Sequence, residues 1–462
     1  MPDKLLIGPR VRRLRASLGL TQKRMAEDLG ISASYLNLIE RNQRAMSAKV
    51  LLRLASTYGF DLAEFTDAGD AQLVAKTFEA LRDPLFRDVP VSKNEVEDLV
   101  GLSPNAARAF NRLWDRREAT PAMPGAPATR RAVDQVRDFI QEARNHWPEL
   151  DATAEALSDE LNLRRREPHA ALTERLKTRH QTAVRIVPQD VMPDMLRWFD
   201  RHNRRINLSE LLPQSGRRFQ LAFQIALLEQ RPLVDAVLDA SALEGREARG
   251  LARTSLANYF AAALLMPYAR FLREAESVRY DVELLSHRFG TSFEQTAHRL
   301  TTLQRDGARG IPFFFLRIDI AGNVSKRFSA GRFAFSERGG ACPIWNIHES
   351  FTDPGRLHTQ MVELPDGTRY FSLAKAVRRG GDVWGRPAQR LAIALGCDVS
   401  YAPRLCYSDS FNLDAPTPAP IGINCHLCER QACRQRAHPP LSKSLMWDER
   451  ARGMSQFRWL PG

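Results

Sequence analysis

The sequence predicts a multidomain, mainly α-helical protein with an α+β region in its C-terminal part. Its 462 residues are enough for roughly three domains with separate cores. Apolar residues recur at helical spacing over long stretches before residue 310. Patterns typical of strands and turns lie at residues 184–218 and again after residue 312. Five of the six cysteines fall after residue 396, which marks the C-terminal part as chemically distinct.

The composition narrows the class of protein. The net charge of +13, from 67 Lys plus Arg against 54 Asp plus Glu, favours polyanionic partners such as nucleic acid or a phosphate-rich small molecule. The chain lacks the roughly 18 consecutive apolar residues of a membrane helix, and its N-terminus lacks the layout of a secretory signal. We therefore expect a cytoplasmic protein without a membrane partner, whose cysteines do not form structural disulfides.

The first predicted domain, residues 1–68, contains four short helices in the order of a helix-turn-helix. Thr21 and Ser32 are suited to cap its second and third helices, and Gly30 suits the turn between them. In this layout the third helix enters the DNA major groove. The segment from Leu20 to Arg44 resembles the XRE family of repressors. A four-helix bundle with a solvated polar face is the alternative, but turn chemistry, spacing and charge together favour DNA binding.

The expected DNA contacts follow from the helix faces and from this family layout. Gln22 opens the second helix, where its amide can reach a base edge or a phosphate. Three residues on the outward half of the third helix are expected to face bases: Ser34, Tyr35 and Asn37. Three others are better placed to contact phosphates: Asn42, Arg44 and Lys49.

Residues 69–129 predict a helical spacer followed by a linker rich in proline and alanine. The spacer helices could mediate dimerisation or pack inside a larger domain. Residues 130–310 predict a second domain, in which strands and turns lead into a helix near residue 218. Thr291 and Glu294 have the spacing of a capping box at the start of a later helix.

The run Arg218–Leu227, RFQLAFQIAL, precedes a second run, ANYFAAALLMP at 257–267, by about 40 residues. This order resembles the ImmA/IrrE-like zinc peptidase domain, whose first run has two zinc-binding histidines and a catalytic glutamate. Phe223, Gln224 and Leu227 stand at those positions and cannot bind zinc or activate water. The resemblance implies that the third ligand of the family is replaced too, because residues 253–255 are Arg, Thr and Ser. We expect a degenerate zincin-like domain with no catalytic residues, in a protein that is not an enzyme.

The last predicted domain, residues 311–462, combines a sensor region with a cysteine-rich tail of α+β type. Its first part predicts a β-hairpin or a meander in which basic and aromatic residues alternate. Such a surface suits a coenzyme A thioester, whose phosphates need cations and whose adenine needs a flat apolar face. A hairpin with one solvated face would show the same pattern. The candidate ligand-binding residues are Arg317, Lys326, Arg327, Phe328, Arg332 and Phe333.

The tail contains a C-x2-C-x4-C array formed by Cys425, Cys428 and Cys433. Thiolates this close repel one another unless a cation or a cluster lies between them. Four residues could supply a fourth ligand: Cys397, Cys406, His426 and His438. Zinc and an iron–sulfur cluster both fit four thiolates, and spacing does not separate them. Reduced thiols without a metal are the third possibility.

The whole arrangement resembles the short-chain fatty acyl transcriptional regulators. The resemblance rests on the order of the parts, on the run ACPIWNIHESF at 341–351 and above all on the cysteine tail. It implies a homodimeric regulator that binds a double-stranded DNA operator and senses short-chain acyl-CoA of acetate, propionate or methylcitrate metabolism. It also implies a [4Fe-4S] cluster in preference to zinc, with Cys397 as the fourth ligand. The alternative is an ImmA/IrrE-type metallopeptidase that cleaves a repressor during stress.

Overall fold

The computed structural model describes residues 8–459 with a series of gaps. The gaps are residues 42, 45, 59–67, 84–85, 87–88, 90, 119–127, 332, 334, 336–340, 380–383, 385–387, 432, 442, 447–449, 451–452 and 456. The chain divides into two compact units, Met1–Thr120 with Ala334–Glu337, and Pro121–Phe333 with Arg338–Gly462. Within the described residues no helix is both long and apolar enough to span a bilayer.

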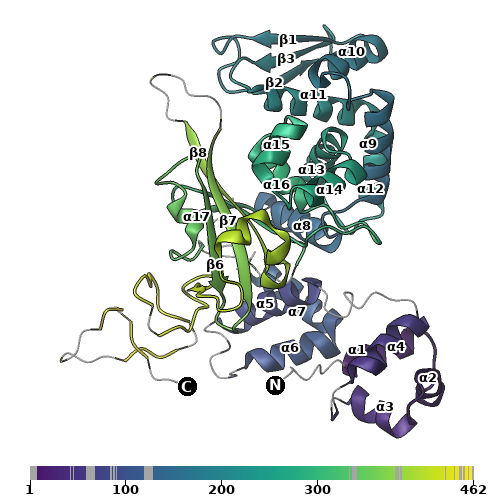
Figure 1. Cartoon of the computed structure of the whole chain (residues 1–462), viewed down its shortest axis with the longest axis vertical. Helices are drawn as coiled ribbons and strands as arrows, with labels where there is room; N and C mark the ends of the chain where they lie inside the picture. Colours follow the sequence, from purple (N-terminus) through teal and green to yellow (C-terminus); the bar gives the residue numbers. More distant parts are fainter. Residues whose placement is uncertain are drawn as a thin grey trace. The chain divides into compact units, whose positions relative to one another are not determined.

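The first unit begins with the predicted helix-turn-helix (Figure 1). Its four helices are α1 Gly8–Ser17, α2 Gln22–Leu29, α3 Ala33–Glu40 and α4 Ala48–Tyr58. Both predicted caps are confirmed, because the hydroxyls of Thr21 and Ser32 accept backbone N–H groups at 3.2 and 3.1 Å. Gly30 ends α2 with a positive φ of 63°, a conformation that favours glycine. Apolar residues of all four helices form the core, including the fully buried Met25 and Leu36.

Three further helices complete the described part of the first unit, and they confirm the helical spacing after residue 69. They are α5 Ala68–Leu81, α6 Lys93–Leu102 and α7 Pro104–Glu118. A small core forms around Val96, Val100 and Ala107. Gln72 on α5 bonds Phe335 through both its amide atoms, at 3.4 and 3.5 Å, so a segment distant in sequence is anchored to this helix.

The second unit starts with a helical core. Its helices are α8 Ala128–Glu142, α9 Pro148–Glu160, α10 Pro168–His180, α11 Gln214–Glu229, α12 Arg231–Asp239, α13 Arg246–Leu265, α14 Tyr268–Ser277, α15 Val282–Phe289 and α16 Phe293–Leu300. Between α10 and α11 lies a three-stranded sheet of β1 Ala183–Val187, β2 Arg197–Asp200 and β3 Arg205–Ser209. The central strand β3 pairs in parallel with β1 and antiparallel with β2. This arrangement confirms the strands expected between residues 184 and 218.

A second sheet of six strands follows in the order β5-β4-β8-β7-β6-β9. The strands are β4 Phe314–Asp319, β5 Val324–Ser329, β6 Leu357–Glu363, β7 Arg369–Arg379, β8 Gln389–Asp398 and β9 Ala419–Pro420. The predicted hairpin is confirmed, since β4 and β5 pair antiparallel. Side chains such as Phe315, Phe371 and Ile393 share a core with residues of α14, α15 and α16. The short helix α17, Asn346–Glu349, contacts β6, β7 and β8.

The capping box of α16 lies one residue later than the sequence suggests. Ser292 accepts the N–H of Gln295 at 3.2 Å, and the Gln295 side chain accepts the N–H of Ser292 at 2.8 Å. Thr291 instead shares a hydrogen bond with Thr296 at 2.8 Å. Glu294 is therefore left to pair with Arg317 of the sheet at 2.6 Å. Two overlapping Thr/Ser-x-x-Glu/Gln patterns compete at this site, and packing of Thr291 in the core selects the second.

A fully buried ion pair connects the helices of the second unit. Arg299 of α16 donates to Asp151 of α9 at 2.7 Å and to the carbonyl of Met266 at 3.0 Å. Tyr259 of α13 donates to the other oxygen of Asp151 at 2.7 Å. Burial alone would raise the pKa of Asp151, but the Arg299 charge and hydrogen bonds from His146, Tyr259 and Arg299 lower it to about 2. Both charges are thus compensated inside the core.

We predict that Arg299→Ala lowers the free energy of unfolding of the second unit by about 3–5 kcal/mol, because Asp151 would remain buried without its cation. Urea denaturation of the full chain measures this change. Arg288→Ala is the matched control, since its pair with Glu274 is partly exposed and should contribute at most about 1 kcal/mol. Equal losses in the two variants would contradict a special role for the buried pair.

Candidate functional site

In the helix-turn-helix, a hydrogen-bonded network fixes the two helices that would meet DNA. Glu40, at the end of α3, is buried and accepts from Arg15 of α1 at 2.6 and 3.2 Å. The amide nitrogen of Gln22 donates to the same carboxylate at 2.7 Å and approaches the Asn37 oxygen at 3.3 Å. Gln22 and Asn37 are therefore held in place before DNA arrives, which lowers the entropy that binding would cost.

The other predicted contacts lie on the outer surface of this domain. Ser34, Arg44 and Lys49 are exposed, and Tyr35 is half-buried. The Arg44 guanidinium lies 6.0 Å from the centre of the Tyr35 ring. Asn42 lies outside the described residues. The structure thus leaves one hydroxyl and two cations available to a polyanion, while Gln22 and Asn37 are engaged with each other.

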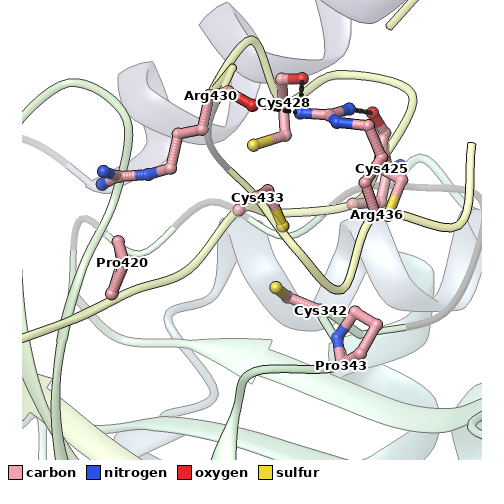
Figure 2. Close-up of a pocket in the computed structure, with 10 residues that line it drawn as sticks. Cys342, Pro343, Pro420, Cys425, Cys428, Arg430, Cys433 and Arg436 are labelled. Carbon is pink, nitrogen blue, oxygen red and sulfur yellow. Dashed lines mark hydrogen bonds between the residues drawn. The ribbon is translucent and has the colours of Figure 1, made fainter. Parts of the chain in front are cut away.

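Four cysteines line one pocket in the C-terminal part of the chain (Figure 2). Three belong to the predicted array, Cys425, Cys428 and Cys433, and the fourth is Cys342. In Figure 2 the sulfurs of Cys342, Cys428 and Cys433 face a common space. Burial raises the pKa of the Cys342 thiol. Among the residues that the structure describes, no three His, Cys, Asp or Glu side chains are arranged as a ready metal-ion site.

Two arginines and a glycine shape the loop around these cysteines. Arg436 donates to the carbonyls of Cys425 and Cys428 at 3.0 and 2.9 Å, and Arg430 donates to Glu363 and Leu364 at the end of β6. A side chain at residue 422 would lie 2.9 Å from the Cys428 sulfur, so glycine leaves this space open. The loop is therefore attached to the six-stranded sheet with its thiols turned inward.

Cys397, which the sequence resemblance suggests as the fourth ligand, does not line this pocket. Its side chain lies in β8 and packs in the apolar cluster that contains Phe371 and Leu395. Burial there raises the pKa of its thiol well above the usual value. Cys342 was missed because it lies more than 80 residues before the array, although it belongs to the characteristic run at 341–351.

Basic side chains form a row across one face of the six-stranded sheet. Lys326 of β5 is directly opposite Arg317 of β4, and Ile393 of β8 separates Arg317 from Lys375 of β7. Residues directly opposite one another in a sheet point to the same face. Two of the predicted ligand-binding residues, Arg317 and Lys326, therefore belong to this basic row, and Lys375 extends it.

A cavity of about 430 Å³ lies beside the Lys375 end of the basic row. It is lined by Gln214, Ser215, Arg218, Glu283, Ser286, His287, Gly290, Thr291, Phe293 and Lys375. The first turn of α11 contributes to this wall without a side-chain cap or an acidic residue, so its backbone amides favour an anion. Lys375 lies 5.5 Å from the centre of the Phe293 ring and pairs with Glu283. The cavity combines cations with an aromatic surface.

None of the predicted ligand-binding residues that the structure describes lines this cavity. Phe333 is buried among Phe314, Trp345 and Tyr370, with ring centres 4.3–5.5 Å away. Phe328 is also buried, and Arg327 is half-buried in β5. Arg332 lies outside the described residues. Phe328 lies on the same face of the sheet as Lys326, opposite Phe315, but it is buried there, and Phe333 follows β5 and packs on other aromatic rings. The aromatic half of the sequence pattern therefore belongs to the core.

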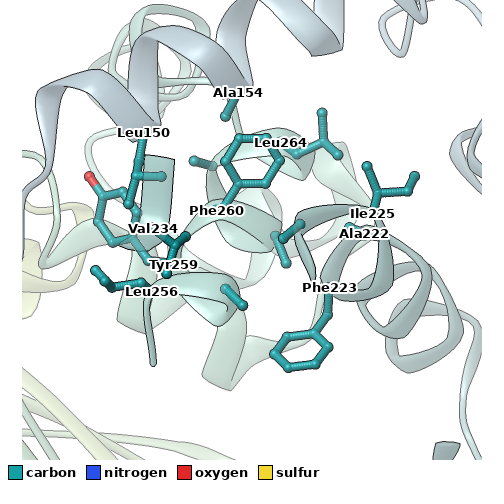
Figure 3. Packing of buried hydrophobic residues seen from close by; sticks show 14 of the residues in the cluster. Leu150, Ala154, Ala222, Phe223, Ile225, Val234, Leu256, Tyr259, Phe260 and Leu264 are labelled. Atoms are coloured by element: carbon teal, nitrogen blue, oxygen red, sulfur yellow. The ribbon is translucent and has the colours of Figure 1, made fainter. Parts of the chain in front are cut away.

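Apolar packing replaces the zinc site at the centre of α11 (Figure 3). Phe223 and Gln224 are buried, and Leu227 packs against the same core. Arg197 of β2 points to this place: it donates to Gln220 at 3.1 Å and to Gln224, and it lies 4.9 Å from the centre of the Phe223 ring. Burial lowers the pKa of Arg197. A guanidinium thus lies beside two of the residues that replace the family's zinc-binding and catalytic side chains.

The residues at the expected position of the third zinc ligand, 253–255, also make other interactions. Arg253 on α13 pairs with Asp235 at 2.6 Å. The hydroxyls of Thr254 and Ser255 donate to carbonyls of their own helix at 3.1 and 3.0 Å. None of the three positions carries the histidine or carboxylate that zinc chemistry of this kind requires. The geometry therefore gives no support to the metallopeptidase alternative.

Known families match three successive parts of the chain. Residues 11–65 match a helix-turn-helix family, residues 177–301 the IrrE N-terminal-like domain, and residues 302–457 the family described as short-chain fatty acyl coenzyme A regulator, C-terminal. The matches follow the order of parts deduced from the residues.

Curated relatives match nearly the whole chain. A propionyl-CoA carboxylase regulator of Cereibacter sphaeroides is 41% identical, with 99% of each chain covered. The HTH-type transcriptional regulators RamB and PrpR of Mycobacterium tuberculosis are each 38% identical, covering 98% and 96% of this chain and 99% and 94% of their own lengths. A solved Mycobacterium tuberculosis transcriptional regulator has a TM-score of 0.67 and 40% identity, over 70% of this chain and 98% of its own.

We predict that Lys49→Ala weakens binding to operator and unrelated DNA by similar factors, because a phosphate contact carries no sequence information. The slope of log affinity against log salt should fall by about 0.9. Fluorescence anisotropy at several salt concentrations measures both quantities. Lys177→Ala, at an exposed lysine on α10, is the control. An unchanged slope would show that Lys49 does not contact a DNA phosphate.

Proposed function

The chain belongs to the short-chain fatty acyl-CoA regulators, and on this premise we propose that it is a homodimeric transcriptional regulator controlled by acyl-CoA. The helix-turn-helix with its prearranged α2 and α3 carries the proposal. A dimer would place two such heads on half-sites about one helical turn apart in a partly palindromic operator. Ligand binding would change operator affinity if it favours one dimer arrangement over another.

We propose that the effector is an acyl-CoA whose phosphates lie on the basic row and in the adjacent cavity. Arg317, Lys375 and the first turn of α11 provide positive charge, and the Phe293 ring offers a surface for the adenine. Glu294 and Glu283 pair with Arg317 and Lys375 in the structure. Phosphate binding would compete with these pairs, and α16 and α15, which carry the two glutamates, would respond directly to the ligand.

We also propose that Cys342, Cys425, Cys428 and Cys433 hold a [4Fe-4S] cluster. Four thiols in one pocket fit its preference for all-cysteine ligation, and the open space at Gly422 and the nearby Arg430 and Arg436 suit an anionic group. When bound, the cluster would supply sensitivity to oxidants or to iron supply. Zinc is the competing occupant, because it accepts the same four sulfurs.

The effector proposal predicts that short acyl-CoA shifts operator affinity. Titration of the protein–operator complex with acetyl-CoA, propionyl-CoA and free CoA at fixed salt measures this shift. We expect Lys375→Ala to weaken acyl-CoA binding by roughly 10- to 100-fold, the loss of one charge-assisted hydrogen bond, and Lys177→Ala to leave it unchanged. No response to any of the three ligands would refute the effector. Acyl-CoA binding by Lys375→Ala at the wild-type affinity would refute only the proposed location of the acyl-CoA site.

The cluster proposal predicts that anaerobically purified protein contains about four iron and four sulfide per chain and absorbs visible light. Cys342→Ala should abolish the iron, sulfide and absorption, whereas Cys397→Ala should retain them, because Cys397 packs in the apolar core. If Cys397→Ala lost the iron and sulfide while Cys342→Ala retained them, the assignment of Cys342 as a ligand would be wrong. A colourless protein loaded with zinc would overturn the cluster itself.

A further inference from the structure

The small sheet of the second unit has an unpaired edge. Its order is β1-β3-β2, so one side of β2 faces β3 and the other faces no strand among the described residues. Ser209 N–H donates to the Leu196 carbonyl at 3.1 Å, and these two residues are directly opposite. Hydrogen-bonded pairs alternate along an antiparallel ladder. The backbone groups of Arg197 and Phe199 must therefore point away from β3, and within the described part of the chain they have no backbone partner.

This edge lacks two of the features that commonly block strand pairing. Residues 197–200 contain neither proline nor lysine. The one cation on the strand, Arg197, is directed toward Gln220 and Gln224 on α11 and so does not cover the edge. Phe199, two residues along, faces the same side and packs against the core. Both residues can present their backbone N–H and carbonyl groups to another strand.

Large apolar side chains surround the edge and are exposed to solvent. Their exposed fractions are 64% for Val191, 50% for Met195, 40% for Leu196 and 49% for Trp198. Four such residues within eight positions form an exposed apolar patch, and patches of this kind commonly mark a protein–protein interface. Hydrogen-bonding groups and apolar area thus occur together on one edge.

The charges on either side of β2 are opposite in sign. Asp190 and Asp194 are exposed in the segment before the strand. Arg201 and Arg204 are exposed in the turn after it. Antiparallel pairing of two identical strands brings the start of one beside the end of the other. The acidic segment of each copy would then lie beside the basic turn of its neighbour, so the edge is complementary to itself.

We propose that β2 pairs with β2 of a second copy of this chain about a two-fold axis at Trp198. Arg197 of each copy then stands opposite Phe199 of the other, and the two pairs form four backbone hydrogen bonds. Trp198 stands opposite Trp198 in a non-hydrogen-bonded pair, where side chains approach most closely. The two small sheets become one continuous sheet of six strands, with the apolar patch buried at its centre.

This interface deepens the proposed function by giving the homodimer a contact outside the DNA-binding head, and its role in operator binding rests on that proposal. The pairing itself depends on neither acyl-CoA nor the cluster. It is testable on the full chain in solution without DNA, so failure of the interface and failure of operator binding are separate results.

Sedimentation equilibrium of the full-length protein tests the interface. We expect a dimer for the wild type and at least tenfold weaker association for Trp198→Asp, because a buried apolar pair would be replaced by two like charges. Leu251→Asp, an exposed leucine on α13, is the matched control and should remain dimeric. A monomeric wild type, or a Trp198→Asp variant that associates as the wild type does, would overturn the proposal.

Charge reversal provides a second test that a folding defect would not reproduce. Asp194→Arg and Arg201→Glu should each weaken association, and the double variant should recover most of it, because each copy then presents both reversed charges. Far-ultraviolet circular dichroism checks that all variants are folded. A double variant no better than either single one would show that the acidic segment and the basic turn do not meet, against the two-fold arrangement.

Discussion

Arg299 and Asp151 are fully buried, and their ion pair fixes the helices on which the rest of the second unit depends. Asp151 comes from α9, Arg299 from α16, and Tyr259 joins them from α13. A buried charge without its partner costs several kcal/mol, so the pair favours one packing register of these three helices. The same register carries Phe293 and Glu294 at the start of α16 to the basic row of the sheet. One polar contact inside the core therefore positions the candidate ligand surface.

The region around Phe223, Gln224 and Leu227, which corresponds to the catalytic site of the peptidase family, has a structural role in this chain. Phe223 and Leu227 extend the core, and Gln224 accepts a hydrogen bond from Arg197. The guanidinium supplies a fixed positive charge near the place where the family holds a metal ion, but it offers no open coordination position and generates no hydroxide. The helices of this domain and its small sheet share one apolar core. The small sheet also contains β2, whose free edge is the proposed contact between two copies of the chain.

The cysteine pocket joins segments that are far apart in the chain. Cys342 precedes α17, whereas Cys425, Cys428 and Cys433 follow β9. Arg430 bonds the end of β6, so the loop and the sheet hold the four thiols together. If a cluster occupies this pocket, its loss would release the segment before α17 from the tail. The chain that leads to Cys342 includes Phe335, which Gln72 binds in the first unit.

Local chemistry allowed the sequence by itself to determine much of this protein. Some features involve only a few neighbouring residues, so spacing and side-chain type are sufficient to predict them. They are the helix caps at Thr21 and Ser32 and the hairpin after Pro312. The loss of the zinc-binding and catalytic residues is equally local, because it is visible in the residue types of Phe223, Gln224 and Leu227. Only the tertiary structure decided which distant residues meet. It placed Cys342 in the cysteine pocket and Cys397 in the core, because the alternation of β8 turns Cys397 toward Phe371. It separated Arg317 and Lys326 from Phe333, and it added Lys375 through strand register. Register and long-range packing depend on residues tens of positions apart, so no local pattern encodes them.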